Sequence, residues 1–103
     1  MNPLKDMPVI LLGSGGHAKV VLDLLLENGF TVCGMTTADP VVLRESVWRG
    51  IPVLGDDDAL ASYPPETYAL ASGIGSVGIP TMRMQIYQRM KAKGYFFPPL
   101  IAR

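Results

Sequence analysis

The stretch from residue 9 to residue 29 constrains the fold more than any other part of this sequence. It begins with Val9 to Leu12, an apolar run short enough for a strand that is buried on both faces. Glycines at positions 13, 15 and 16 follow and turn the chain. A helical pattern comes next and stops at Gly29, where glycine can take the left-handed conformation that often ends a helix. This order predicts a strand, a tight turn and a helix as one unit.

The helix in this unit is expected to be mostly buried. Lys19, Asp23 and Glu27 recur at four-residue spacing and form one narrow polar stripe. The rest of the circumference is apolar and consists of Ala18, Val20, Val21, Leu22, Leu24, Leu25 and Leu26.

The junction between this strand and this helix is typical of an anion site. Unpaired backbone N–H groups and the positive end of the helix dipole point at one place there. The spacing Gly13-x-Gly15-x-x-Ala18 also matches the dinucleotide fingerprint, with alanine in the last position. The pattern favours a phosphate-bearing ligand, and a bare structural turn is the alternative.

Length, charge and cysteine content exclude several classes of protein. A chain of 103 residues makes one domain. Nine lysines and arginines balance nine aspartates and glutamates, and no basic cluster with interleaved aromatics occurs, so nucleic acid is not an expected partner. No apolar run approaches the ~20 residues of a membrane span, and residues 1–7 lack the apolar core of a signal peptide, so we expect a soluble cytoplasmic protein. Cys33 is the only cysteine and lies in an apolar run, which predicts a small buried hydrophobe rather than a reactive thiol.

The remainder of the chain alternates between strand and helix patterns. We expect strands at 30–35, 51–54 and 67–72, a helix start at 55–61, a helix from Pro80 to Gly94, a strand and exit at 95–103, and irregular chain at 41–49. The aspartates at 56–58 are expected to cap that helix start rather than to bind metal. Short loops between alternating elements indicate an α/β fold with a small, doubly wound, Rossmann-like parallel sheet and helices on both faces.

A sheet of this kind binds ligands outside the carboxyl ends of its strands, at the point where the strand order reverses. That point is expected between the first strand and the strand at 67–72. Two glycine loops would border it, one at 13–17 and one at Gly73-Ile-Gly-Ser-Val-Gly78, with Thr36 to Asp39 at the rim. Because both glycine loops would border the same point, we expect one ligand-binding crevice between them.

A nicotinamide dinucleotide is the less favoured ligand for this crevice. Its sites normally place an acidic residue at the end of the second strand, about 20 residues past the glycines, to hold the ribose. Thr36 and Thr37 occupy that place, and Asp39 comes slightly late and precedes a proline. A free-standing nucleotide or NAD(P)-binding module with a regulatory role is therefore the second hypothesis. A scaffold whose glycine loops are empty turns is the third.

Several short motifs lie along nearly the whole chain. They are Gly-Ser-Gly-Gly-His-Ala-Lys-Val-Val at 13–21, Val32-x-Gly34, Gly50-Ile-Pro-Val-Leu-Gly55, and Ile74-Gly75 with Arg83 and Ile86-Tyr87. Together they resemble the N-terminal domain of bacterial sugar acetyltransferases, namely the sialic acid O-acetyltransferases of the NeuD type and the UDP-4-amino-sugar N-acetyltransferases of the PglD type, which act in protein and pilin glycosylation. The resemblance implies that residues 1–94 form a domain that binds a UDP-amino sugar. It also implies that residues 95–103 lead toward a left-handed β-helix of hexapeptide repeats, which binds acetyl-CoA and forms a homotrimer.

The same resemblance assigns residues to the ligand. The diphosphate would lie against Gly13, Ser14, Gly15, Gly16 and His17, and the nucleoside against Gly73, Ile74, Gly75 and Ser76. Relatives usually carry an aspartate or an Asp-Asp pair where this chain reads Thr36-Thr37-Ala38. Thr36 and Thr37 are therefore assigned to the ligand, but this departure leaves the nucleoside contacts there, and hence the preferred base, open. The imidazole of His17 either bonds to the backbone or faces the ligand. No catalytic or metal-binding residue is assigned, because the catalytic histidine of the family lies in the β-helix domain. We therefore expect this chain to bind without catalysing and to hold no cofactor itself.

Overall fold

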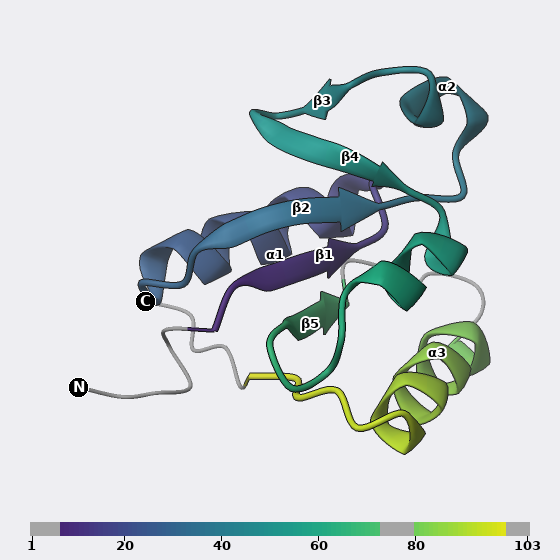
Figure 1. Cartoon of the computed structure of the whole chain (residues 1–103). Helices are drawn as coiled ribbons and strands as arrows, with labels where there is room; N and C mark the ends of the chain where they lie inside the picture. Colours follow the sequence, from purple (N-terminus) through teal and green to yellow (C-terminus); the bar gives the residue numbers. More distant parts are fainter. Residues whose placement is uncertain (1–6, 73–79, 99–103) are drawn as a thin grey trace.

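The computed structural model describes residues 7–72 and 80–98, which form one sheet with helices packed on it (Figure 1). The elements are β1 (Val9–Leu12), α1 (Gly16–Glu27), β2 (Val32–Thr36), α2 (Pro40–Leu43), β3 (Val47–Trp48), β4 (Ile51–Gly55), the 3₁₀ helix η1 (Asp57–Ser62), β5 (Ala69–Ser72) and α3 (Pro80–Ala92). The second glycine loop, predicted at 73–78, lies outside the described residues.

The sheet has five strands in the order β3-β4-β2-β1-β5. The pairs β1–β2, β1–β5 and β2–β4 are parallel, whereas β3 pairs with β4 in the antiparallel sense. The chain therefore steps outward from β1 through β2 to β4 and then returns to the other side of β1 as β5. The predicted reversal of strand order between the first strand and the strand at 67–72 is confirmed.

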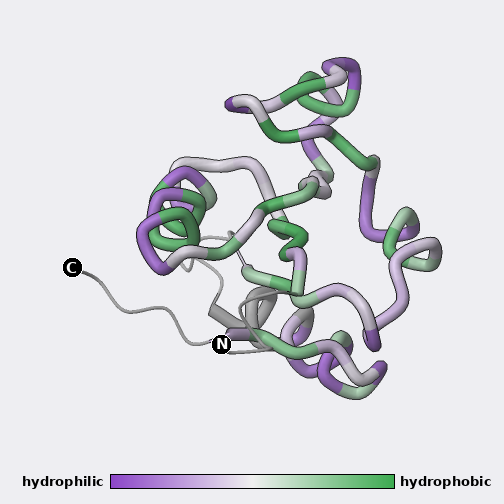
Figure 2. The backbone as a smooth tube through the Cα atoms, turned by 60° about the vertical axis from the view of Figure 1, so that its left-hand side comes forward, coloured by the Kyte–Doolittle hydropathy of each residue, from purple (hydrophilic) through white to green (hydrophobic). Residues whose placement is uncertain are grey.

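Each face of the sheet has its own apolar core. Side chains alternate along a strand, so Val9 and Leu11 face α1, whereas Ile10 and Leu12 face η1 and α3. All four residues of β1 are buried, because this strand lies inside the sheet and has cover on both faces. Figure 2 shows hydrophobic stretches both in the centre of the molecule and in its outlying segments, and hydrophilic and hydrophobic positions side by side along the helices. The predicted α/β fold with helices on both faces is confirmed.

Helix α1 is less buried than its sequence predicts. Ala18, Val21, Leu22 and Leu25 are buried against the sheet. Val20 and Leu26, expected in the buried part of the circumference, are 53% and 55% exposed. A helix that packs on one sheet face covers only the arc turned toward that sheet, and among the described residues no second layer covers the opposite arc of α1.

The segment 41–49, expected to be irregular, contains α2 and β3. The Asp39 carboxylate caps α2 by accepting from the Val41 N–H at 2.9 Å. Arg49 and Gly50 then form a two-residue turn between β3 and β4, with φ angles of 51° and 83°. Positive φ at both positions is typical of the mirror-image turns that join antiparallel strands, but the first position usually holds asparagine, aspartate or glycine. Because arginine is unusual at this position, the sequence did not indicate the hairpin.

Two further elements differ in kind from the prediction. The helix start at 55–61 is a 3₁₀ helix, capped as predicted by an aspartate, since the Asp56 carboxylate accepts from the Asp58 N–H at 3.0 Å. The strand predicted from residue 95 is reduced to one parallel bridge between Ala69 and Phe96 within the described residues. Helix α3 ends near Gly94 as predicted, and this glycine has a φ of 97°.

Candidate functional site

The first glycine loop joins β1 to α1 at the carboxyl edge of the sheet. Gly13 has a φ of 100°, and its N–H donates to the Thr36 carbonyl at 2.7 Å, which continues the ladder between β1 and β2 by one residue. Gly15 then occupies the position before α1 with an extended backbone and no capping side chain. The loop thus leaves the sheet and enters the helix within three residues.

The start of α1 is arranged to attract an anion. The Gly15 carbonyl accepts from the N–H groups of Ala18 and Lys19, at 3.0 and 3.3 Å. The N–H groups of Gly16 and His17 come earlier and have no acceptor within the helix. The first turn contains no acidic residue that would compete for these donors. The positive end of the helix dipole and free N–H groups therefore meet at this point.

Space for a ligand exists beside these N–H groups. A Cβ atom built on Gly15 or Gly16 would meet no heavy atom of residues 7–72 and 80–98 within 4 Å. Both glycines are exposed, and neither has the positive φ that would make a side chain strained. Packing and backbone conformation among the described residues therefore do not require glycine here, and the backbone is open to close approach.

Hydrogen bonds hold the loop against the ends of β2 and β4. The hydroxyl oxygens of Ser14 and Thr37 lie 2.7 Å apart. The Thr37 hydroxyl also accepts from the Asp39 N–H at 3.0 Å, and the Thr37 N–H donates to the Gly55 carbonyl at 3.0 Å. Thr37 therefore connects the glycine loop, the end of β2 and the end of β4.

Two other hydroxyl groups lie at the same edge. Thr36 at the end of β2 is fully buried, and Ser72 ends β5. Their oxygens Oγ1 and Oγ are closed to solvent and make no hydrogen bond within the part of the chain that the structure describes. Ser72 is absent from the residues that sequence reasoning assigned to the site. The sequence could have indicated Ser72, because it is the first polar residue after a buried apolar run, as Thr36 is in β2.

The structure brings together one half of the predicted site. Residues Gly13 to His17 lie at the carboxyl edge, and Ser14 contacts Thr37. Thr36 and Thr37 are buried rather than at a rim, and only Ala38 and Asp39 of that segment are exposed. His17 is half-buried, and within the described part of the chain its imidazole makes no hydrogen bond. Gly73, Ile74, Gly75 and Ser76 lie outside the described residues.

Cys33 lies away from this edge, near the start of β2. It is half-buried, and its Sγ lies 3.5 Å from the Val9 carbonyl oxygen. Burial raises the pKa of the Cys33 thiol, which keeps it protonated at neutral pH and poorly nucleophilic. The prediction of an unreactive thiol is therefore supported, although the side chain is less buried than expected.

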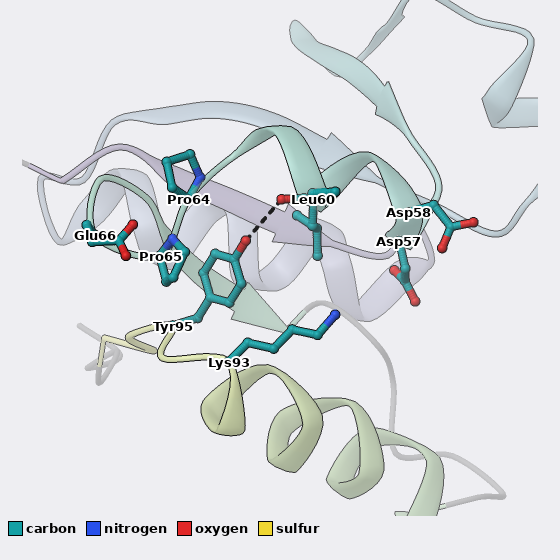
Figure 3. A pocket seen from close by; sticks show the side chains of 9 residues that line it. Asp57, Asp58, Leu60, Pro64, Pro65, Glu66, Lys93 and Tyr95 are labelled. Atoms are coloured by element: carbon teal, nitrogen blue, oxygen red, sulfur yellow. Dashed lines mark hydrogen bonds between the residues drawn. The ribbon is translucent and has the colours of Figure 1, made fainter.

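A cavity of about 410 Å³ lies elsewhere, between η1, the turn before β5 and the end of α3 (Figure 3). Its lining includes Asp57, Leu60, Glu66, Lys93 and Tyr95. The Tyr95 hydroxyl donates to the main-chain carbonyls of Leu60 and Tyr63, so this hydroxyl has a structural role. None of the residues predicted to bind the ligand lines this cavity.

Within residues 7–72 and 80–98, no cluster of three or more histidine, cysteine, aspartate or glutamate side chains could hold a metal ion. In the same residues, no helix combines the length and the apolar character that crossing a membrane requires.

Solved structures of acetyltransferases resemble this chain. The acetyltransferase domain of PglB from Neisseria gonorrhoeae FA1090 matches with a TM-score of 0.73 and 28% identity, covering 92% of this chain and 44% of that one. The same domain in complex with acetyl coenzyme A matches with a TM-score of 0.69 and 28% identity, covering 87% and 41%. A histidine-to-asparagine mutant of perosamine N-acetyltransferase from Caulobacter crescentus, in complex with CoA and GDP-perosamine, matches with a TM-score of 0.70 and 34% identity, covering 85% and 39%.

This chain thus spans less than half of the length of each of those structures. A search of the curated proteins found no match. The sequence model of the PglD N-terminal domain matches residues 8–90, which include β1, the glycine loop, α1 and most of α3. On this match, and with an α/β fold shared with these acetyltransferases, the chain belongs to the family of the PglD N-terminal domain.

Proposed function

We propose that this chain is the nucleotide-sugar-binding domain of an acetyl-CoA-dependent sugar acetyltransferase, with a UDP-linked amino sugar as the ligand. The proposed role belongs to bacterial glycan biosynthesis or to protein and pilin glycosylation. The observation that carries it is the uncapped start of α1, which opens beside β1 at the reversal of strand order. One of the similar acetyltransferase structures holds GDP-perosamine, which supports a nucleotide sugar as the class of ligand.

In this proposal, the diphosphate lies against the first glycine loop. The N–H groups of Gly16 and His17 donate to its oxygens, and the missing Cβ of Gly15 lets it approach the backbone. Thr37 holds Ser14 in place through their hydroxyl contact, so the loop is shaped before the ligand arrives. A preformed loop loses less conformational entropy on binding than one that must be ordered.

The structure gives a reason to rank NAD(P) second. The acidic residue that could hold a ribose hydroxyl is Asp39, and its carboxylate accepts from the Val41 N–H to cap α2. A ribose would therefore have to share the Asp39 carboxylate with this cap. A free-standing NAD(P)-binding module is therefore the less favoured reading.

Catalysis belongs to another part of the longer protein in this proposal. Acetyl transfer needs a general base near the acceptor atom and donors for the developing oxyanion. His17 is the only histidine of the chain, and it lies at the phosphate loop rather than at the sugar end of the ligand. We propose that acetyl-CoA and the catalytic base are supplied by a β-helix domain that assembles as a trimer, as the family resemblance implies.

Calorimetry tests the binding half of this proposal. The chain is titrated with a UDP-4-amino sugar, GDP-perosamine and NAD. We expect a UDP-amino sugar to bind more tightly than NAD. Tighter binding of NAD would favour the regulatory module, and binding of none of the three would favour an empty scaffold.

An activity assay tests the other half. The chain is incubated with acetyl-CoA and a saturating UDP-amino sugar, and free thiol release is followed. We expect no turnover above the uncatalysed rate. Turnover that is lost in His17→Ala would contradict both the division of labour and the role given to the loop.

A further inference from the structure

The segment from α2 to β4 carries apolar side chains that the described rest of the chain does not cover. Val41, Leu43 and Val47 are 66%, 40% and 54% exposed, and they make up half of the large hydrophobic residues that are exposed among the described ones. None of the residues 38–59, all of which the structure describes, is buried. Figure 1 shows α2 and β3 at the outer end of the sheet, beyond β4. Exposed apolar side chains gathered in one place are typical of an interaction surface.

Strand β3 also has free hydrogen-bonding groups at this end of the sheet. It is the outermost strand in the order β3-β4-β2-β1-β5. The Ser46 carbonyl accepts from the Val53 N–H at 3.0 Å. Hydrogen-bonded and non-hydrogen-bonded pairs alternate along antiparallel strands, so the next pair, Val47 with Pro52, is not hydrogen-bonded. The N–H and C=O of Val47 therefore point toward the open edge, where no described strand lies.

The charges on either side of Val47 are self-complementary. Glu45 and Arg49 lie two positions before and two positions after it, and both are exposed. Neither forms an ion pair within residues 7–72 and 80–98. The Arg49 guanidinium lies 5.5 Å from the centroid of the Trp48 ring, a contact through its face that leaves the N–H groups in its plane free for a carboxylate.

We propose that β3 is the interface of a symmetric dimer, in which the β3 strands of two copies of this chain pair in the antiparallel sense about Val47. The Val47 N–H of each copy donates to the Val47 carbonyl of the other. This pairing places Glu45 of each copy beside Arg49 of the other, and opposite charges across an antiparallel pair stabilise it. A twofold interface uses the same patch on both copies and closes on itself, so the exposed strand edge does not continue into a fibre.

This dimer leaves the other parts of the domain accessible. The glycine loop follows β1, which β4 and β2 separate from β3. Phe96 forms its bridge with Ala69 of β5, so the chain passes the opposite edge of the sheet near its carboxyl end. Pairing through β3 is thus compatible with the proposed ligand site and with a following domain, and it depends on neither.

Sedimentation equilibrium of the unchanged chain is the first test. The measurement covers about 10 μM to 1 mM, because an interface between two short strands is smaller than the standard size and associates weakly. We expect an equilibrium between monomer and dimer without larger species. A strictly monomeric chain over this range, or a series of larger species, would overturn the proposal.

Charge reversal tests the register of the pairing. Glu45→Arg and Arg49→Glu each give like charges in both cross-strand pairs, and each variant should dissociate about tenfold more readily than the unchanged chain. An equal mixture of the two variants should recover the original dissociation constant, because all facing charges are then opposite. Glu27→Arg makes the same change of charge at an exposed position of α1 and should have no effect. Single variants that dimerise like the unchanged chain, or a mixture that associates no better than either variant alone, would overturn the pairing about Val47.

Val47→Lys tests the centre of the interface. It brings two like charges face to face on the twofold axis and should abolish the dimer, while circular dichroism shows an intact fold. Val20→Lys is the matched control, because Val20 lies on α1 and is 53% exposed, compared with 54% for Val47. Loss of the dimer in both variants would indicate unspecific apolar association and would overturn the assignment to β3. Nucleotide-sugar binding, measured by calorimetry, should be the same in Val47→Lys and the unchanged chain, so the outcome is independent of the proposed function.

Discussion

The hydroxyl oxygens of Ser14 and Thr37 lie 2.7 Å apart and join the glycine loop to the end of β2 across 23 positions of sequence. Thr37 is 3% exposed, so water competes little for this contact. The same threonine oxygen accepts from the Asp39 N–H at the start of the segment that leads to α2. The shape of the glycine loop therefore depends on β2, which lies later in the sequence.

A double-mutant cycle should show this coupling. Ser14→Ala and Thr37→Val each remove one hydroxyl, and the double variant should lose less stability than the sum of both. We expect a coupling energy of about 1 kcal/mol, the usual net value of one hydrogen bond, from urea unfolding curves. Ser14→Ala combined with Ser62→Ala, at an exposed position away from the loop, should be additive. Additive effects in the first pair would contradict a structural role for the contact.

Gly15→Val should abolish nucleotide-sugar binding and leave the fold intact. The new Cβ meets no atom of the described residues within 4 Å, but it would occupy the space that the proposed diphosphate needs. Calorimetry measures the affinity, and circular dichroism checks the fold. A folded Gly15→Val protein with unchanged affinity would refute the placement of the diphosphate.

Gly34→Ala should destabilise the domain by about 1–3 kcal/mol, the usual cost of overpacking a core. Gly34 lies in β2, and a Cβ built on it would lie 2.6 Å from Leu54 Cγ and within 2.8 Å of both methyl carbons. The whole end of the leucine side chain must then move. Gly16→Ala is the matched control, because the same methyl group meets open space there. Urea unfolding should show a loss for the first variant and none for the second.

Tyr95→Phe should cost about 1 kcal/mol of stability. The buried phenol donates to the carbonyls of Leu60 and Tyr63 at the end of η1. In the variant, the Leu60 carbonyl still accepts a hydrogen bond from the Tyr63 N–H, at 2.9 Å. The Tyr63 carbonyl, in contrast, loses its hydrogen bond to the phenol. Tyr87→Phe, at a position that is 43% exposed, should change stability little and serves as the control.

The stability of the domain should fall above pH 10 in a way that depends on Tyr95. Burial, and secondly the negative charge of Glu66, raise the pKa of Tyr95 above its ordinary value of 10.0. The unfolded chain therefore releases the phenolic proton at lower pH than the folded chain. This contribution is fully present below pH 10 and is lost as the pH rises through the folded-state pKa. The stability difference between the unchanged chain and Tyr95→Phe should shrink over this range, and a constant difference would contradict the assignment.

The local parts of this fold could be predicted from the sequence alone. The run Val9 to Leu12, the glycines after it and the helical pattern up to Gly29 describe elements whose conformation depends on neighbours in the chain, and the structure contains all of them. The reversal of strand order followed from the alternation of strands and helices and the short loops between them. The motifs also pointed to the family, which the match over residues 8–90 shows.

Contacts between distant residues decided the rest. The buried arc of α1 depends on which face meets the sheet, and this left Val20 exposed although its residue type suits a core. The hairpin at Arg49 forms because β4 offers a partner strand, against the local preference of arginine. Thr36 and Ser72 lie far apart in the sequence and come to either side of Leu12 only because β1 separates β2 from β5. A sequence pattern records the preferences of each segment, whereas strand order and side-chain contacts arise only when the segments pack together.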